Sequence, residues 1–181
     1  MGRLLERLAE LGLERDTIVV YTSDHGDFLG DHHFIQKGQM PCRSLLNVPL
    51  IVAHPDSAPG RVDAVVSNVD VMPTLLAACG LEIPASVQGS VLPKPGEPAR
   101  RPYALASGWS KVSPAYRHDS LYLADWRITV YPNLRDGELY NLREDPYEHY
   151  NLYHDAGYRA LRNELMGELL LAVGAAEEPH P

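Results

Sequence analysis

The first fifty residues change from a helical to a strand-like hydrophobic pattern. Residues 2–11 place leucines three and four positions apart, the spacing of one helix face, and Gly12 follows as a residue that commonly ends a helix. Residues 17–22 form a short β-branched and aromatic run, which predicts a buried strand. Residues 48–52 predict a second buried strand. This order of elements indicates an α/β protein.

A second helix is predicted after the paired strands. Asp70 is a favourable N-cap residue, Pro73 falls in the first turn, and apolar residues continue to Gly80. Residues 85–102 are rich in Pro, Gly and Ser, a composition typical of a surface linker.

The last third of the chain reads as short strands followed by a helix. Strands are predicted at 103–106, 120–124 and 126–131, and Asp136-Gly137 is a hairpin-turn signal. A final helix is predicted over 156–173, with apolar residues at four-residue spacing. These residues are Leu161, Leu165, Leu169 and Val173.

The composition narrows the class of protein. Of the 181 residues, 45% are hydrophobic and 22% are charged, which is typical of a globular domain. The formal charge of −8 argues against a nucleic-acid partner, and no apolar run approaches the ~18 residues of a membrane span. Two cysteines give no disulfide framework, and the charged, amphipathic N-terminus does not read as a signal peptide. A cytoplasmic location is therefore expected.

Candidate chemistry gathers where the first strand ends, at Ser23-Asp24-His25-Gly26. In α/β sheets, functional groups gather beyond the carboxyl ends of strands. Gly26 permits a sharp turn, so that Asp24 and His25 can converge on one divalent cation. The alternative is a solvated turn in which Asp24 caps backbone groups. Lys37 is likewise either an anion ligand or an ordinary surface lysine.

Three stretches of the chain occur in an order that resembles a known family. The first reads SDHGDFLGDH, followed later by KG and NVPLIV, and the second reads SNVDVMPTLL. The third reads ELYNLREDP, followed by Glu148, Asn151 and Leu152. Asn151 is expected to cap the segment after it. Together they resemble the C-terminal portion of sulfatases, members of the alkaline-phosphatase-like superfamily. The resemblance implies an α/β fold: part of a sandwich with a central mixed sheet flanked by helices, then a small antiparallel sheet and a final helix. Residues 1–84 would be the later half of the core, 85–102 a linker, and 103–181 the small sheet with its helix.

The same resemblance implies a function, the metal-dependent hydrolysis of small-molecule sulfate esters. By the motif match, Asp24 and His25 would be metal ligands and Lys37 would bind a sulfate oxygen and oppose charge on the leaving group. His32 or His33 would line the substrate pocket. The ion would be calcium, with manganese or magnesium admitted because a nitrogen ligand stands where many relatives have asparagine.

Sulfatases also carry an upstream Asp-Asp pair and a Cys/Ser-x-Pro-x-Arg motif, whose first residue becomes the formylglycine nucleophile. The chain has no Asp-Asp pair, and neither Cys42 nor Cys79 fits the motif. Ser57 to Arg61 matches it literally but lies in a turn-rich connector with no helix N-terminus around it. We therefore expect a C-terminal fragment that is inactive alone, and that associates with the missing N-terminal segment or with a second copy of itself.

Two other functions stay open at this point. One is a phosphonate or phosphodiester hydrolase on the same scaffold, which would share the metal and the lysine. The other is a non-catalytic fragment that acts as a binding or assembly module. The sequence leaves the natural ester, the metal and the oligomeric state undetermined.

Overall fold

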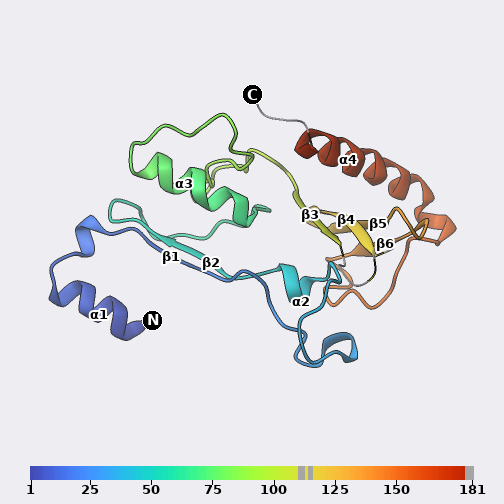
Figure 1. Ribbon diagram of the computed structural model, residues 1–181, viewed down its shortest axis with the longest axis horizontal. Helices are drawn as coiled ribbons and strands as arrows, with labels where there is room; N and C mark the ends of the chain where they lie inside the picture. The colour runs from blue at the N-terminus through green and yellow to red at the C-terminus, as the bar shows by residue number, and fades with distance from the viewer. Residues whose placement is uncertain (110–112, 114–115, 178–181) are drawn as a thin grey trace.

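A computed structural model describes residues 1–109, 113 and 116–177 of the chain (Figure 1). Its helices and strands in chain order are α1 (Gly2–Glu10), β1 (Val19–Thr22), α2 (Arg43–Leu46), β2 (Leu50–Ala53), α3 (Val71–Ala78), β3 (Ala104–Trp109), β4 (Arg117–Tyr122), β5 (Trp126–Tyr131), β6 (Asp136–Asn141) and α4 (Arg159–Glu177). In Figure 1, α1, β1, β2 and α3 lie at one end of the molecule, and β3 to β6 with α4 lie at the other. The short helix α2 lies between them. None of the described helices is both long and apolar enough to cross a membrane.

The main hydrophobic core lies between the second sheet and α4. Strands β3, β4, β5 and β6 form an antiparallel sheet in chain order. Leu121, Ile128 and Leu139 are fully buried on one face of this sheet and belong to one cluster with Leu165 and Leu169 of α4. The four-residue spacing of the leucines places them on the helix face that the sheet covers. The predicted strands and final helix are therefore confirmed.

The hairpin turn predicted at Asp136-Gly137 is wrong. These two residues begin β6 and pair with Tyr131 and Val130 of β5. The turn lies at residues 132–135 instead, where Arg135 adopts the positive φ of 53°. Gly137 is required for close packing, because a Cβ there would lie 2.6 Å from the carbonyl oxygen of Thr129.

The first sheet differs from the expected architecture. Strands β1 and β2 pair antiparallel, with Val20 opposite Val52, and they pair only with each other among the described residues. The central mixed sheet is thus absent from the described part of the chain. The prediction that both strands are buried is also wrong, since Tyr21 is 45% exposed and Ile51 is 60% exposed. An apolar run alone does not reveal whether anything covers it.

The helices of this end form where the sequence predicts them. Gly12, with φ of 69°, follows α1 as expected. The leucine face of α1 has no buried residue: Leu4 is 58% exposed and Leu5 43% exposed. An apolar helix face that is exposed in this way is typical of a surface that another polypeptide covers.

Asp70 occupies the N-cap position of α3, as predicted, but its side chain has another role. Its side chain makes no cap hydrogen bond to α3; it accepts hydrogen bonds from the backbone N–H groups of Ser67 and Ser90 and forms an ion pair with Arg101. Thr74 also accepts a hydrogen bond, from the backbone N–H of Leu92. Residues 85–102 contain no helix or strand, but these contacts fix parts of them to α3. The division into two units and a linker stays a prediction.

Leu169→Ala should lower the free energy of unfolding by about 2–5 kcal/mol, because it leaves a cavity in the core between α4 and the sheet. Leu171→Ala on the same helix is the matched control, since that side chain is 77% exposed and its loss should change the free energy by no more than about 0.5 kcal/mol. Urea unfolding followed by circular dichroism measures both. Equal effects from the two variants would contradict this description of the core.

Candidate functional site

The turn that follows β1 is held by its own hydrogen bonds. Ser23 Oγ donates to the carbonyl oxygen of His25 at 2.7 Å, and the backbone N–H of His25 donates to Asp24 Oδ1 at 3.0 Å. Asn68 adds a contact from outside the turn, donating from Nδ2 to the carbonyl oxygen of Ser23 at 3.0 Å. These bonds fix the direction in which Asp24 and His25 leave the backbone.

The two side chains converge. Asp24 Oδ2 lies 3.5 Å from His25 Nε2, a separation at which both atoms can reach one ion. The hydrogen bond from the backbone N–H of His25 lowers the pKa of Asp24 below its ordinary value. Because the Asp24 side chain is 84% exposed, the carboxylate is ionised at neutral pH and accessible to a ligand. Metal binding by this pair stays a prediction.

Lys37 completes the group. His25 Nδ1 lies 2.8 Å from the carbonyl oxygen of Gly26, which can only accept, so Nδ1 carries the ring proton. Nε2 then has a free lone pair, and Lys37 Nζ donates to it at 2.8 Å. A backbone carbonyl that fixes the tautomer is typical of histidines that bind metals. An ion at Nε2 requires the ammonium to move away, which the long, exposed lysine side chain permits.

Gly26 is needed for a reason that the sequence did not reveal. It is not among the glycines with positive φ, so a left-handed turn does not explain it. Its backbone N–H donates to the carbonyl oxygen of Leu45 at 2.8 Å, and a Cβ there would lie 2.0 Å from the carbonyl oxygen of Ser44. The glycine therefore allows the turn to pack directly against α2.

The loop that carries Lys37 has an unusual backbone. Leu29, His32 and His33 have φ values of 49°, 49° and 65°. Residues other than glycine rarely adopt this positive-φ region. Phe28 anchors the loop: it is 2% exposed and packs with Cys42 and Leu45. Strained backbone of this kind is concentrated at functional sites.

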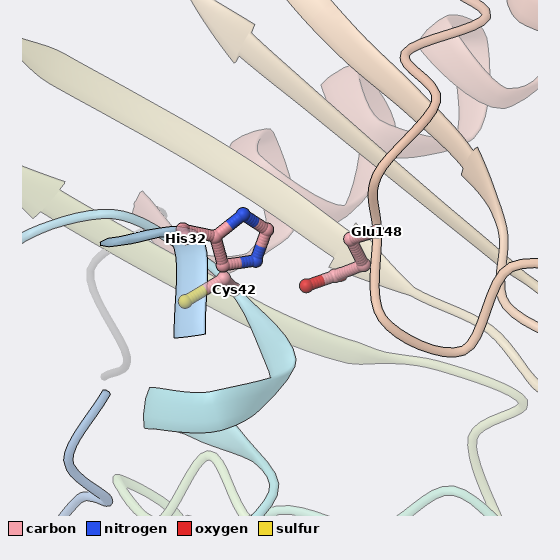
Figure 2. A group of neighbouring side chains, drawn as sticks. All are labelled: His32, Cys42 and Glu148. Atoms are coloured by element: carbon pink, nitrogen blue, oxygen red, sulfur yellow. The ribbon is translucent and has the colours of Figure 1, made fainter. Parts of the chain in front are cut away.

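The two loop histidines differ in their surroundings. His33 is exposed. The His32 ring lies against Phe28 and His149, with centroid distances of 6.3 Å and 5.9 Å. Figure 2 shows His32 beside Cys42 and Glu148, three residues from distant parts of the chain. One potential ligand atom from each lies within 4.8 Å of the others.

Glu148 was recognised in the sequence only as part of the third motif, with no role assigned to it, yet it connects the two ends of the molecule. It is 2% exposed and accepts two hydrogen bonds, at Oε1 from Arg127 Nε (2.5 Å) and at Oε2 from the backbone N–H of Arg43 (2.7 Å). Arg43 is the first residue of α2. The ion pair therefore fixes the start of α2 to the second sheet, while the far end of α2 holds Gly26.

Arg127 is the buried counterpart of Glu148. It is 2% exposed, donates to Thr129 Oγ1 at 2.7 Å and pairs with Glu138 Oε2 at 2.8 Å. Its guanidinium also lies over the Tyr140 ring, 4.6 Å from the centroid. The available sequence signal was a single charged residue inside a strand of aromatic and β-branched residues.

Asn151 caps the segment after it, as predicted, and also contacts β6. Its Oδ1 accepts hydrogen bonds from the backbone N–H groups of Leu139 and Tyr153, and its Nδ2 donates to the carbonyl oxygen of Gly137. The side chain therefore ties the segment after the sheet to the edge strand β6.

Comparison with known proteins identifies close similarities over most of the chain. Residues 30–173 match the family model described as N-sulphoglucosamine sulphohydrolase, C-terminal. An N-acetylglucosamine-6-O-sulfatase of Bacteroides thetaiotaomicron is 32% identical over 177 residues, which cover 92% of this chain and 32% of that protein.

Solved structures also match this chain over most of its length. A protein in complex with its substrate D-glucosamine-2-N,6-O-disulfate matches 99% of this chain and 39% of its own length, with a TM-score of 0.85 and 29% identity. A phosphonate monoester hydrolase of Silicibacter pomeroyi matches 94% of this chain and 37% of its own length, with a TM-score of 0.80 and 25% identity. The chain spans about a third of the length of the curated relatives that it matches.

Gly26→Ala should lower the free energy of unfolding by about 1–3 kcal/mol, because the new methyl group would overlap the carbonyl oxygen of Ser44. Gly167→Ala in α4 is the control: a Cβ there meets no atom within 4 Å, so the change should be neutral or stabilise by up to about 1 kcal/mol. Thermal and urea unfolding measure both variants. If Gly26→Ala is tolerated as well as Gly167→Ala, the close approach between the turn and α2 is wrong.

Proposed function

The chain belongs to the sulfatase family, and we propose that it supplies part of the active site of an enzyme that hydrolyses sulfate esters. The observation that carries the proposal is the convergence of Asp24, His25 and Lys37 at the carboxyl end of β1. These are the residues that the sulfatase motif match selects, and they contact one another within a single turn and loop. The full-length protein would perform the reaction.

Asp24 and His25 fit two positions around a divalent ion. The Asp24 carboxylate is exposed and ionised, and the tautomer of His25 directs a lone pair from Nε2 toward the same space. Calcium usually takes six to eight ligands, mostly oxygens, so the other ligands would come from elsewhere in the full-length protein. Manganese or magnesium also suits this pair. Such an ion would polarise the oxygens of a bound sulfate.

Lys37 would bind the sulfate group. In the structure its ammonium lies 2.8 Å from His25 Nε2, and it would turn toward a sulfate oxygen when Nε2 binds an ion. A compact positive charge at that place would stabilise the negative charge that develops on the leaving oxygen. Of the two loop histidines, exposed His33 is the one that we keep as a substrate contact, because the His32 ring packs against Phe28 and His149.

The nucleophile would come from outside this chain. Ser57 lies in the connector after β2, where its backbone N–H donates to the carbonyl oxygen of His54. Arg61 pairs with Asp63 and is 88% exposed. These contacts describe a surface turn and support the view that a formylglycine, if present, arises in another part of the full-length protein.

A sulfated sugar is the substrate class with most support. The similar protein of Bacteroides thetaiotaomicron is an N-acetylglucosamine-6-O-sulfatase, and the similar solved structure contains a disulfated glucosamine. We propose the same class for the full-length protein.

The exposed apolar residues of α1, β1 and β2 support a further polypeptide partner. Leu4, Tyr21 and Ile51 are 58%, 45% and 60% exposed, and large apolar residues gathered in this way usually mark an interface. We propose that the remainder of the α/β core of a sulfatase covers them. A second copy of this chain is the alternative.

A phosphonate monoester hydrolase is the second candidate function, favoured by the likeness to the Silicibacter pomeroyi structure. Turnover of an aryl sulfate and of an aryl phosphonate by the full-length protein separates the two. We expect the sulfate to be the better substrate by kcat/KM. Preference for the phosphonate would replace the sulfatase proposal, and turnover of neither ester would favour a non-catalytic module.

Lys37→Ala in the full-length enzyme should lower kcat for an aryl sulfate by ~10²-fold or more, because it removes a preorganised charge from the transition state. Lys37→Arg should also fail, since a planar guanidinium does not replace a compact ammonium in a fitted pocket. Steady-state kinetics measures both variants.

Arg61→Ala is the matched control for loss of a surface cation, and it should leave kcat within about twofold, consistent with the small effects of most surface substitutions. Near-normal kcat in Lys37→Ala would remove the lysine from the proposed mechanism. The proposal for Asp24 and His25 would then rest on metal binding alone.

A further inference from the structure

We propose that His32, Cys42 and Glu148 form a second metal site, for a borderline divalent ion such as Zn²⁺ or Co²⁺. One ligand atom from each residue lies within 4.8 Å of the other two (Figure 2). Within the described residues, this is the one cluster of three or more such side chains. Its ligand set is separate from Asp24 and His25, which suit calcium.

The donor set selects the ion. A thiolate, an imidazole and one carboxylate oxygen are typical ligands of zinc, with bonds of ~2.0–2.3 Å, whereas calcium prefers oxygens alone. Ligand atoms around such an ion lie roughly 3–4 Å apart, so the cluster needs to contract only slightly. His32 is only partly buried, which leaves its ring room to adjust. Water would take the fourth tetrahedral position.

Glu148 can accept an ion while it keeps its present partners. Arg127 Nε occupies one lone pair of Oε1, and the N–H of Arg43 occupies one lone pair of Oε2. A carboxylate offers about four acceptor positions on its two oxygens, so each oxygen retains one. The hydrogen bonds that fix Glu148 would also orient it toward the ion, as contacts behind a metal ligand usually do.

The charge around Glu148 favours a cation. In the described part of the chain, one buried guanidinium, Arg127, pairs with two carboxylates, Glu138 and Glu148. Buried charge without compensation is costly. The charges of Arg127, Glu138 and Glu148 sum to a net negative charge. A divalent ion together with the Cys42 thiolate would neutralise it.

The Cys42 thiol would lose its proton only when the ion binds. Burial raises the pKa of its thiol, and the negative charge of Glu148 adds to that effect, so the free side chain is a neutral thiol at neutral pH. An ion would displace the proton and bind the thiolate. The other cysteine, Cys79, is exposed and free, which makes it a natural control.

The site would act as a clamp between three segments. His32 belongs to the loop with positive φ values, Cys42 is the residue before α2, and Glu148 lies in the segment after β6. An ion held by all three would fasten the loop that carries Lys37 to α2 and to the second sheet. This would stabilise the strained loop in one conformation.

Titration of the purified wild-type chain with Co²⁺ tests the proposal. A cobalt–thiolate bond gives a charge-transfer band in the near ultraviolet, and tetrahedral Co²⁺ gives visible absorption. We expect both, saturating at one ion per chain and abolished by an equivalent of Zn²⁺. Absence of the thiolate band in the wild-type chain would overturn the proposal, whatever the variants do.

Two pairs of variants locate the ion. In the cysteine pair, Cys42→Ser should abolish the charge-transfer band and Cys79→Ser should retain it. In the histidine pair, His32→Asn should weaken Co²⁺ affinity by at least ~10-fold, and His33→Asn should leave the affinity unchanged. Circular dichroism establishes that each variant is folded. A band that survives Cys42→Ser and disappears in Cys79→Ser would place the ion elsewhere and refute the site. Asp24→Ala should leave the band unchanged, so this result is independent of the proposed sulfatase site.

Discussion

The ion pair between Arg127 and Glu148 is the contact on which the arrangement of the molecule depends. Both side chains are only 2% exposed, so neither charge has water to compensate it. Removing one partner of such a pair typically costs about 3–5 kcal/mol. Glu148 also accepts the N–H that begins α2, and Leu45 of α2 accepts the N–H of Gly26. The second sheet thereby fixes the position of a turn more than a hundred residues earlier in the chain.

This connection gives the short turn the rigidity that the proposed chemistry requires. Asp24 and His25 lie on an exposed segment at the end of a two-stranded sheet, which alone would give little rigidity. Contacts through α2, and from Asn68, hold the turn instead. Catalytic side chains need support of this kind, because small displacements of a reacting group reduce rates strongly. In our proposal the same framework serves the sulfatase site and, through Cys42 and His32, a second ion.

Sequence reasoning succeeded where the determining pattern is local. The four-residue spacing of Leu161, Leu165 and Leu169 predicted α4, and adjacency in the motif predicted that Asp24 and His25 converge. It failed where distant residues decide. The exposure of Tyr21 and Ile51 is not visible in the apolar runs of β1 and β2, and the hydrogen bond between Glu148 and Arg43 joins positions 105 apart. The dipeptide Asp136-Gly137 suggested a turn by its composition, but both residues pair with β5 and the turn lies at residues 132–135.

The central claim is that the turn after β1 holds the ion of a sulfatase. Its most direct test is the calcium content of the full-length protein, measured by mass spectrometry after exhaustive dialysis, for the wild type, Asp24→Ala and the surface control Asp63→Ala. The account predicts that the wild type and Asp63→Ala retain about one ion per molecule, and that Asp24→Ala loses both the ion and aryl sulfate hydrolysis. An Asp24→Ala protein that keeps its ion and its activity would contradict it.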